Sequence, residues 1–160
     1  MDNLYAPWRV EYIKGPRASG CFLCAALRGS DDKASLLVHR GKTCGIILNR
    51  FPYNGGHVLV FPHRHVDDLT LLTDEESAEM HLLACRCIRA VRGIMSPQGF
   101  NLGINMGSAA GAGLEEHLHL HLLPRWRGDT NFMSTVAATK VIPNPLDRLW
   151  EDLRAALAET

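Results

Sequence analysis

Three histidines alternate with leucines in the run His-Leu-His-Leu-His-Leu-Leu at residues 117–123, and this row constrains the chain more than any other feature. Side chains on a β-strand point to alternate faces, so a strand here would place His117, His119 and His121 on one face and leucines on the other. Imidazoles need hydrogen-bond partners when they are buried, which makes three in a row a costly way to build a core. The row therefore indicates a functional site.

Two kinds of chemistry fit such a row. Two strand histidines spaced two residues apart are a common pair of ligands for a catalytic metal. Alternatively, one imidazole is a nucleophile, and its neighbours orient it and hold phosphate oxygens. A glycine-rich segment at 107–113 lies directly before the row, and glycines let backbone N–H groups converge on an anion. By itself such a segment is an ordinary flexible turn, but beside three histidines it favours a phosphate ligand.

The histidine row is one of four segments that we predict to be strands. Apolar runs at 43–48 and 57–61 flank a stretch of turn-forming residues, which predicts an antiparallel hairpin with a long connection. Residues 100–105 and 117–123 are the other two predicted strands.

Two helices accompany these strands. The longer one begins at Thr73, which can form a capping box with Glu76, and it ends at residues 96–99. A second helix starts at Pro145 and buries a leucine-rich face. Strands joined by hairpins around one long helix predict an antiparallel α+β domain. The apolar stripe of the longer helix consists of Met80, Ala84, Ile88, Val91 and Met95.

The composition is that of one globular domain. The 160 residues are 46% hydrophobic and 21% charged, enough for one core and too few for two ordinary domains. Lys plus Arg and Asp plus Glu both number 17, so the chain lacks the basic excess expected of a nucleic-acid-binding protein. It also lacks an apolar run long enough to cross a bilayer, and its start does not resemble a signal peptide. We expect a small ligand, and neither nucleic acid nor membrane as a partner.

The five cysteines argue for a reducing compartment, the cytoplasm, because their number is odd and two of them lie inside the predicted long helix. Cys21 and Cys24 have the spacing of a metal-binding pair, but two ligands make only half a site. A redox dithiol and a pair of unmetallated buried thiols are the alternatives. Either His63 or His65 is a candidate third ligand, and spacing alone does not separate them.

The chain resembles the histidine-triad (HIT) family, whose signature separates three histidines by hydrophobic residues. The segments 47–50 and 56–62 look like the nucleoside-binding hairpin of that family, and 100–107 resembles the strand and loop before its triad. This resemblance implies a HIT-like fold, with a five-stranded antiparallel sheet, one long helix, a C-terminal helix and usually a homodimer. It covers about residues 20–126, so we expect a single domain over 1–160 with a C-terminal extension at 127–160.

The resemblance also implies a role for each site residue. His119 corresponds to the nucleophile of the family, which attacks an α-phosphorus and forms a nucleotidyl-histidine intermediate. His121 and His57 would contact phosphate oxygens and stabilise the transition state. Asn49 stands where the family commonly places a ribose-binding residue, although an ordinary turn asparagine fits equally well. The other expected substrate-binding positions are Asn105, Ser108, Gly113 and His117.

Zinc-bearing relatives of the family extend the cysteine motif to a complete site. They use two such cysteines together with the histidines that correspond to His65 and His117, and this chain has all four residues. A Cys₂His₂ set closes the tetrahedral shell of zinc, so the metal would be structural and would leave no position for substrate.

The ends of the chain indicate a branch of the family. Residues 7–13 and 124–133 look like the bacterial branch that includes diadenosine tetraphosphate phosphorylases. Gly113 stands where the dinucleoside-polyphosphate hydrolases commonly have glutamine, and Leu114 stands where the small nucleoside phosphoramidases have serine or threonine. We therefore expect cleavage of dinucleoside polyphosphates such as diadenosine tetraphosphate, with inorganic phosphate or water as the acceptor.

Two other functions and one further set of residues stay open at this point. A nucleoside phosphoramidase, or a nucleotide-binding regulatory protein with little turnover, would use the same triad. Basic side chains after the triad either bind the acceptor phosphate or form a solvated face. They are Arg125, Arg127 and Lys140.

Overall fold

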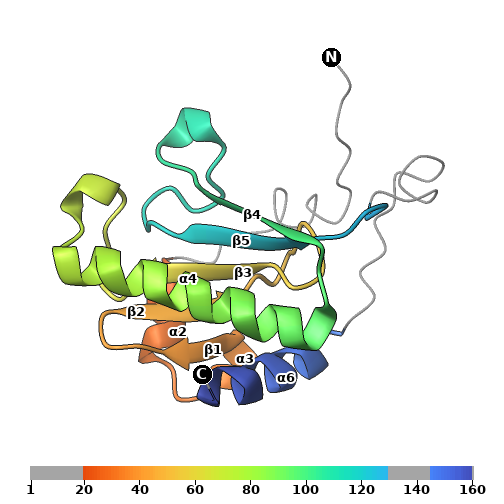
Figure 1. Cartoon of the computed structure of the whole chain (residues 1–160). Coiled ribbons are helices and arrows are strands. Elements are labelled where there is room, and N and C mark those ends of the chain that lie inside the picture. The colour runs from red at the N-terminus through yellow and green to blue at the C-terminus, as the bar shows by residue number, and fades with distance from the viewer. Residues whose placement is uncertain (1–19, 130–144, 160) are drawn as a thin grey trace.

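A computed structural model describes residues 20–129 and 145–159. One antiparallel sheet of five strands forms the centre of the fold, in the order β1-β2-β3-β5-β4 (Figure 1). This sheet and the long helix confirm the predicted α+β fold with a five-stranded antiparallel sheet. The strands are β1 (Leu37–Arg40), β2 (Cys44–Leu48), β3 (Val58–Pro62), β4 (Gly99–Ile104) and β5 (Leu120–Arg125).

The long helix α4 (Asp74–Met95) begins where the sequence predicts. Thr73 is its N-cap and forms both hydrogen bonds of a capping box with Glu76. The helix ends at Ser96, whose φ of 48° is left-handed. The other helices are α2 (Phe22–Arg28), α3 (Asp32–Ser35), α6 (Leu146–Ala158) and the short 3₁₀ turns η1 (Leu69–Leu71) and η2 (Ser108–Ala110).

Helix α4 covers one face of the sheet, and the histidines lie on the other face. The thiol of Cys44 donates a hydrogen bond to the carbonyl oxygen of Glu76 in α4, which shows that this residue of β2 faces the helix. Alternation along β2 then turns Ile47 to the opposite face, together with its cross-strand neighbours Leu59 and His121. The sheet therefore separates the helical core from the histidine site.

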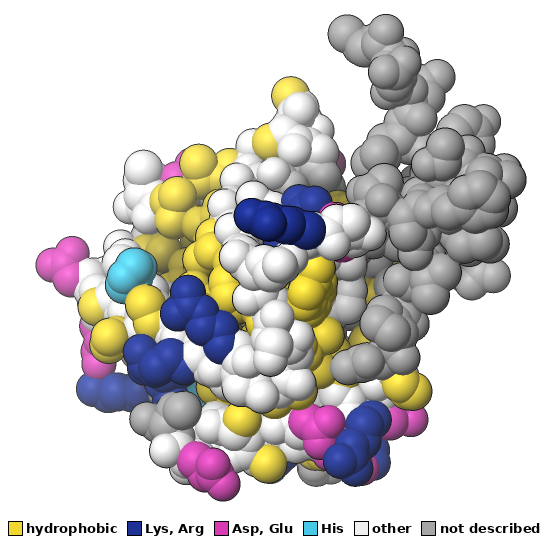
Figure 2. All heavy atoms as spheres, turned by 45° about the vertical axis from the view of Figure 1, so that its right-hand side comes forward, with side chains coloured by type: hydrophobic (Ala, Val, Ile, Leu, Met, Phe, Trp, Pro, Cys, Tyr) yellow, Lys and Arg dark blue, Asp and Glu magenta, His cyan; other side chains and the backbone are white. Residues whose placement is uncertain are grey.

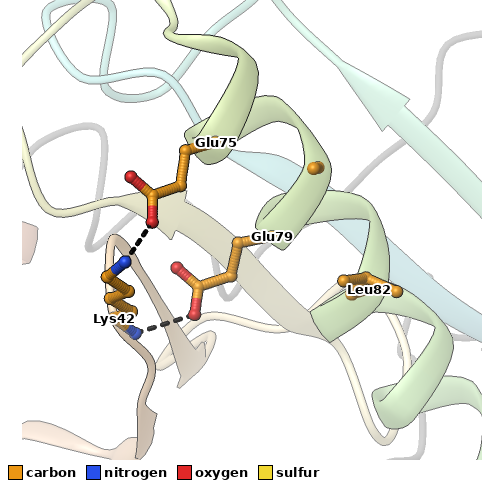
Figure 3. Close-up of a pocket in the computed structure, with 5 residues that line it drawn as sticks. Lys42, Glu75, Glu79 and Leu82 are labelled. Carbon is orange, nitrogen blue, oxygen red and sulfur yellow. Dashed lines mark hydrogen bonds and ion pairs between the residues drawn. The ribbon is translucent and has the colours of Figure 1, made fainter.

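A carboxylate joins α4 to the turn between β1 and β2. Glu79 accepts hydrogen bonds from the backbone N–H groups of Lys42, Thr43 and Cys44. Figure 3 shows Lys42 between Glu79 and Glu75, at the rim of a shallow hollow that Leu82 also lines. Because the Glu79 carboxylate is occupied by its own chain, this contact stabilises the fold and leaves no ligand site there.

Helix α6 packs beside α4 and against β1, at the edge of the sheet farthest from β4 (Figure 1). Leu149, Leu153 and Leu157 are buried in this contact. The indole N–H of Trp150 donates a hydrogen bond to the carbonyl of Leu37 at 2.9 Å. The predicted final helix and its leucine face are thus confirmed, although Pro145 is its N-cap instead of its first helical residue.

Two strand predictions need correction. Strand β1 has no counterpart among the four segments predicted from the residues, because it is only four residues long and follows the short helix α3. Strand β5 begins at Leu120, whereas the prediction was 117. The backbone N–H of Leu118 donates to the carbonyl of Val66, in the segment after β3, and residues 117–119 lie outside the β3–β5 ladder.

The surface of the described residues mixes apolar, basic and acidic side chains. Figure 2 shows Lys and Arg in several small groups on the face it presents, with acidic and hydrophobic side chains between them. No helix in the described part of the chain is long and apolar enough to cross a membrane. The segments 2–17 and 130–144, which include Lys140, lie outside the described residues.

Candidate functional site

Three histidine rings lie in a row on the face of the sheet opposite α4, where His57 and His119 are buried. His57 stands directly before β3, His121 lies in β5, and His119 lies just before β5. The Nε2 atom of His57 is 2.9 Å from Nδ1 of His121. The rings of His119 and His121 meet edge to face, with centroids 4.7 Å apart. The structure thus brings together the three residues predicted to be catalytic.

His119 has a defined tautomer. Its Nδ1 atom is 2.8 Å from the backbone carbonyl oxygen of His117. Because a carbonyl oxygen only accepts, Nδ1 carries the proton, and in the neutral ring the lone pair is on Nε2. Burial lowers the pKa of His119, while the bond to the His117 carbonyl opposes that effect. The ring therefore presents an unprotonated Nε2, as a nucleophile must.

His57 has the opposite tautomer. Its Nδ1 atom lies 3.2 Å from the backbone nitrogen of Tyr53 and 3.2 Å from Nδ2 of Asn49. The amide of Asn49 is oriented unambiguously, because its Oδ1 atom accepts from the backbone N–H of Phe51 at 3.0 Å. With two donors directed at Nδ1, the proton of the neutral ring is on Nε2. His57 therefore donates to His121, whose own proton must then be on Nε2.

Tyr53 is a contributor to this site that the sequence prediction missed. Besides its backbone contact with His57, its ring stacks on the His57 ring, with centroids 5.0 Å apart and an interplanar angle of 21°. Its position four residues before His57, inside the turn-forming stretch, was the available signal. That signal is weak, because almost any residue at this position could donate its backbone N–H.

Four side chains from three distant segments form a cluster beside the rings of His57, His119 and His121. One ligand atom from each of Cys21, Cys24, His65 and His117 lies within 4.8 Å of the other three. Cys21 is the N-cap of α2, and the first helical turn brings Cys24 back beside it. Sγ of Cys21 is 3.1 Å from Nδ1 of His117, and Sγ of Cys24 is 3.3 Å from Nδ1 of His65. The structure places His65 in the cluster, and His63 is not part of it.

The donor set and its spacing fit a tetrahedral metal ion. Zinc bonds of 2.0–2.3 Å place neighbouring ligands about 3.3–3.8 Å apart, close to the distances in this cluster. The Nε2 atom of His117 is 2.9 Å from the carbonyl oxygen of Pro62, so Nε2 carries the proton and the Nδ1 lone pair faces the sulfurs. A second hydrogen bond of this kind is typical of metal-binding histidines. The cluster is therefore a candidate metal centre.

The remaining predicted residues belong to the loop between β4 and β5 or to the segment after the triad. Asn105 is half-buried and Ser108 is exposed, and both belong, with Gly113, to the loop that carries η2 between β4 and β5. The Arg125 guanidinium bonds both carboxylate oxygens of Asp129 and the side chain of Asn101. Arg127 is exposed.

Comparison with known proteins identifies the family. The model of the HIT domain matches residues 31–128, which is more than half of the chain. The chain belongs to the HIT family. It is 39% identical over 166 residues to a Mycobacterium tuberculosis protein named AP-4-A phosphorylase, covering 99% of this chain and 83% of that protein. This full-length similarity to a named enzyme confirms the prediction of a HIT-family enzyme.

Two further relatives add to the picture. The Bacillus subtilis HIT protein named Protein hit is 30% identical over 113 residues, which is 70% of this chain and 76% of that protein. A solved structure described as a Zn-bound histidine triad family protein from Mycobacterium smegmatis superposes with a TM-score of 0.69 at 33% identity. It covers 88% of this chain and 94% of that one. A HIT protein that resembles this chain throughout therefore binds zinc.

Proposed function

We propose that this HIT protein cleaves dinucleoside polyphosphates such as diadenosine tetraphosphate at an α-phosphate, and that inorganic phosphate is the favoured acceptor. The observation that carries the proposal is the hydrogen bond from Nδ1 of His119 to the His117 carbonyl, which leaves Nε2 as the nucleophilic atom. The name of the M. tuberculosis relative, AP-4-A phosphorylase, supports this substrate and acceptor.

The first step transfers a nucleoside monophosphate to His119. Nε2 attacks the α-phosphorus, a P–N bond forms, and the P–O bond to the remaining polyphosphate breaks. The Nδ1–H of His119 stays on the His117 carbonyl throughout, so the positive charge that develops on the ring is stabilised by that carbonyl dipole. The leaving group from diadenosine tetraphosphate is ATP.

The second step releases the nucleotide. Inorganic phosphate attacks the same phosphorus and the P–N bond breaks, which yields ADP and restores neutral His119. Water as the acceptor would yield AMP instead. The Nε2–H of His121, fixed by its bond from His57, is the donor that we assign to the phosphate oxygens in both steps.

Substrate binding outside the triad uses the hairpin and the glycine-rich loop. Asn49 still has a free lone pair on Oδ1 and a second N–H on Nδ2, with which it can bind a ribose hydroxyl while it holds His57. The loop of Asn105, Ser108 and Gly113 supplies donors for the polyphosphate chain. Arg127 is a better candidate for the acceptor phosphate than Arg125, whose guanidinium is already paired with Asp129. Lys140 stays a candidate on the sequence alone.

The cluster of Cys21, Cys24, His65 and His117 would hold zinc, with a structural role. Bound there, zinc has four protein ligands and supplies a cross-link, with no position left for water or substrate. Both cysteines must stay reduced, which fits the predicted cytoplasmic location. We also propose a homodimer, since β4 is an edge strand whose Leu102 is 47% exposed, and light scattering of the purified protein would test it.

The deciding experiment compares products with and without phosphate. Metal-replete protein is incubated with diadenosine tetraphosphate, and His119→Ala is the control. ADP plus ATP that appear only with phosphate establish a phosphorylase, whereas AMP plus ATP in both conditions make the protein a hydrolase. Turnover that survives in His119→Ala contradicts the covalent mechanism. No turnover in either condition would favour a nucleoside phosphoramidase or a binding protein.

A further inference from the structure

We propose that His117 couples the metal site to the nucleophile, so that metal occupancy holds His119 in its reactive tautomer. The proposal rests on the function proposed above only in naming His119 as the nucleophile. It makes His117 a positioning residue, and it gives the metal a role in catalysis although no substrate reaches it.

His117 is held from three sides. Its Nδ1 atom lies 3.1 Å from Sγ of Cys21 and 3.5 Å from Sγ of Cys24. Its Nε2–H donates to the Pro62 carbonyl at 2.9 Å, and its own carbonyl accepts from Nδ1 of His119 at 2.8 Å. The residue is fully buried, with an exposed fraction of 0%. Only three covalent bonds separate the ring from the carbonyl carbon, so a ring held at both nitrogens restricts where the carbonyl can lie.

The peptide unit between His117 and Leu118 is also held at its N–H end, by the segment that carries the other histidine ligand, His65. The N–H of Leu118 shares a peptide plane with the His117 carbonyl, and it donates to the carbonyl of Val66 at 2.6 Å. Val66 directly follows His65, whose Nδ1 atom belongs to the metal cluster. Two of the four ligands thus orient one peptide plane, from its carbonyl side and from its N–H side. That plane presents the oxygen that holds the proton of His119.

Loss of the metal would loosen this arrangement. The metal would no longer join His117 to Cys21, Cys24 and His65. Only weak thiol–imidazole contacts would remain, since a thiol is a weak hydrogen-bond donor and acceptor. The His117 carbonyl could then move, and the ring of His119 could exchange its proton between the two nitrogens. Only the fraction with an unprotonated Nε2 reacts. When a residue that orients a metal ligand through a hydrogen bond is mutated, metal affinity or activity typically falls 10–100-fold.

The substrate-holding side of the site has its own anchors. His57 is oriented by Asn49 and by the Tyr53 backbone, and His121 is oriented by His57. These contacts do not run through the metal cluster. We therefore expect metal loss to lower kcat strongly and to change KM little.

The test uses Cys24→Ser, which weakens the metal site with almost no change in volume. The matched control is Cys85→Ser, the same substitution at a half-buried cysteine of α4 outside the cluster. A rescue variant, Cys24→His, supplies a replacement imidazole ligand. Three measurements are made on each protein: its zinc content, the ring ¹⁵N NMR shifts of His119, and steady-state kinetics that give kcat and KM. The kinetics are run at a temperature where circular dichroism shows the protein to be folded.

We expect folded, zinc-poor Cys24→Ser to show a mixture of His119 tautomers and a kcat about 10–100-fold lower, with KM within about threefold. Cys85→Ser should match the wild type, and Cys24→His should recover zinc, the single tautomer and most of kcat. A zinc-poor protein that keeps one His119 tautomer and a wild-type kcat overturns the proposal. A metal-free protein that is simply unfolded also overturns it, because the metal would then act through folding.

The NMR measurement separates this inference from the proposed function. If the wild type does not cleave diadenosine tetraphosphate, the function is wrong, but the His119 ring still reports whether zinc controls its tautomer. Removal of zinc from the wild type with a chelator, followed by its return, gives the same readout without mutation. The shifts of His119 must change and then recover, or the coupling is refuted.

Discussion

At the scale of single residues, the chemistry depends on where protons sit on three imidazoles. His119 keeps its proton on Nδ1 because it faces a carbonyl, and His57 keeps its proton on Nε2 because two donors face its Nδ1 atom. His121 then accepts at Nδ1, so its neutral ring carries its proton on Nε2. In the proposed mechanism, this arrangement sets the nucleophile His119 beside His121, the donor to the phosphate, with ring centroids 4.7 Å apart.

A substitution of His57 tests this chain of hydrogen bonds. His57→Phe keeps a ring in the buried position but removes the donor to His121, so His121 is no longer fixed with its proton on Nε2. We expect kcat/KM to fall about 10²–10³-fold, the usual cost of losing one donor to a developing charge. Steady-state kinetics with diadenosine tetraphosphate measures the effect.

The control for this substitution is His39→Phe, at a half-buried histidine of β1 outside the site. It should leave the kinetics near wild type. A His57→Phe protein with unchanged kcat/KM would mean that His121 does not depend on His57.

The sequence predicted the side chains of the site much better than their hydrogen-bond partners. The histidine row and the Cys21–Cys24 pair were visible because residue type and spacing carry their chemistry. The Pro62 carbonyl and the Tyr53 N–H were not, since every residue has these groups and only the fold selects which ones matter. Spacing alone could not separate His63 from His65 for the same reason, because the turn after β3 decides which ring reaches the cysteines.

At the scale of elements, the start of α4 joins the helix to the segment that carries His65. Glu76 is 4% exposed, and its carboxylate accepts hydrogen bonds from Arg64 and from the backbone N–H of Thr73. The capping box was readable from sequence, whereas the ion pair with Arg64 was not, because it depends on the path of the chain after β3. Strand β1 was missed because four residues are too few to show a period.

The buried carboxylate predicts how stability depends on pH. The bonds from Arg64 lower the pKa of Glu76 from its usual 4.5 to about 2. A lowered pKa in the folded state stabilises the protein above pH 4.5, and this contribution is lost as the pH falls toward 2. The full shift would be worth about 3 kcal/mol, but Arg64 is half exposed and solvent screens the pair, so we expect about 1–2 kcal/mol.

Urea unfolding of Glu76→Gln between pH 2 and pH 7 is the measurement. The variant should be less stable at pH 7 by that amount and should lose less stability on acidification than the wild type. Glu75→Gln is the control, because that carboxylate lies in the same helical turn but pairs on the surface with Lys42. Parallel pH curves for Glu76→Gln and wild type would contradict the assignment.

At the scale of the whole molecule, the two faces of the sheet differ in what they carry. One face packs on α4, and the other carries the histidines and the candidate metal cluster, together with buried apolar residues such as Ile47 and Leu59. Helix α6 lies outside the matched residues 31–128 of the HIT domain, yet it packs on α4 and β1. It should therefore contribute to stability and leave the chemistry of the histidine face unchanged.

Leu153→Ala tests that division. Leu153 is 0% exposed in α6, and its truncation leaves a cavity, so we expect a loss of about 2–4 kcal/mol in the free energy of unfolding. The matched control is Leu82→Ala, the same substitution at a leucine that is 61% exposed on α4, with an expected change of at most about 0.5 kcal/mol. Denaturant unfolding measures both, and kcat per folded molecule should stay near wild type in each. A single cooperative transition at lower stability would show that α6 folds with the sheet. If Leu153→Ala instead lowered kcat while the sheet stayed folded, α6 would act on the histidine face through α4, and the two faces would not be independent.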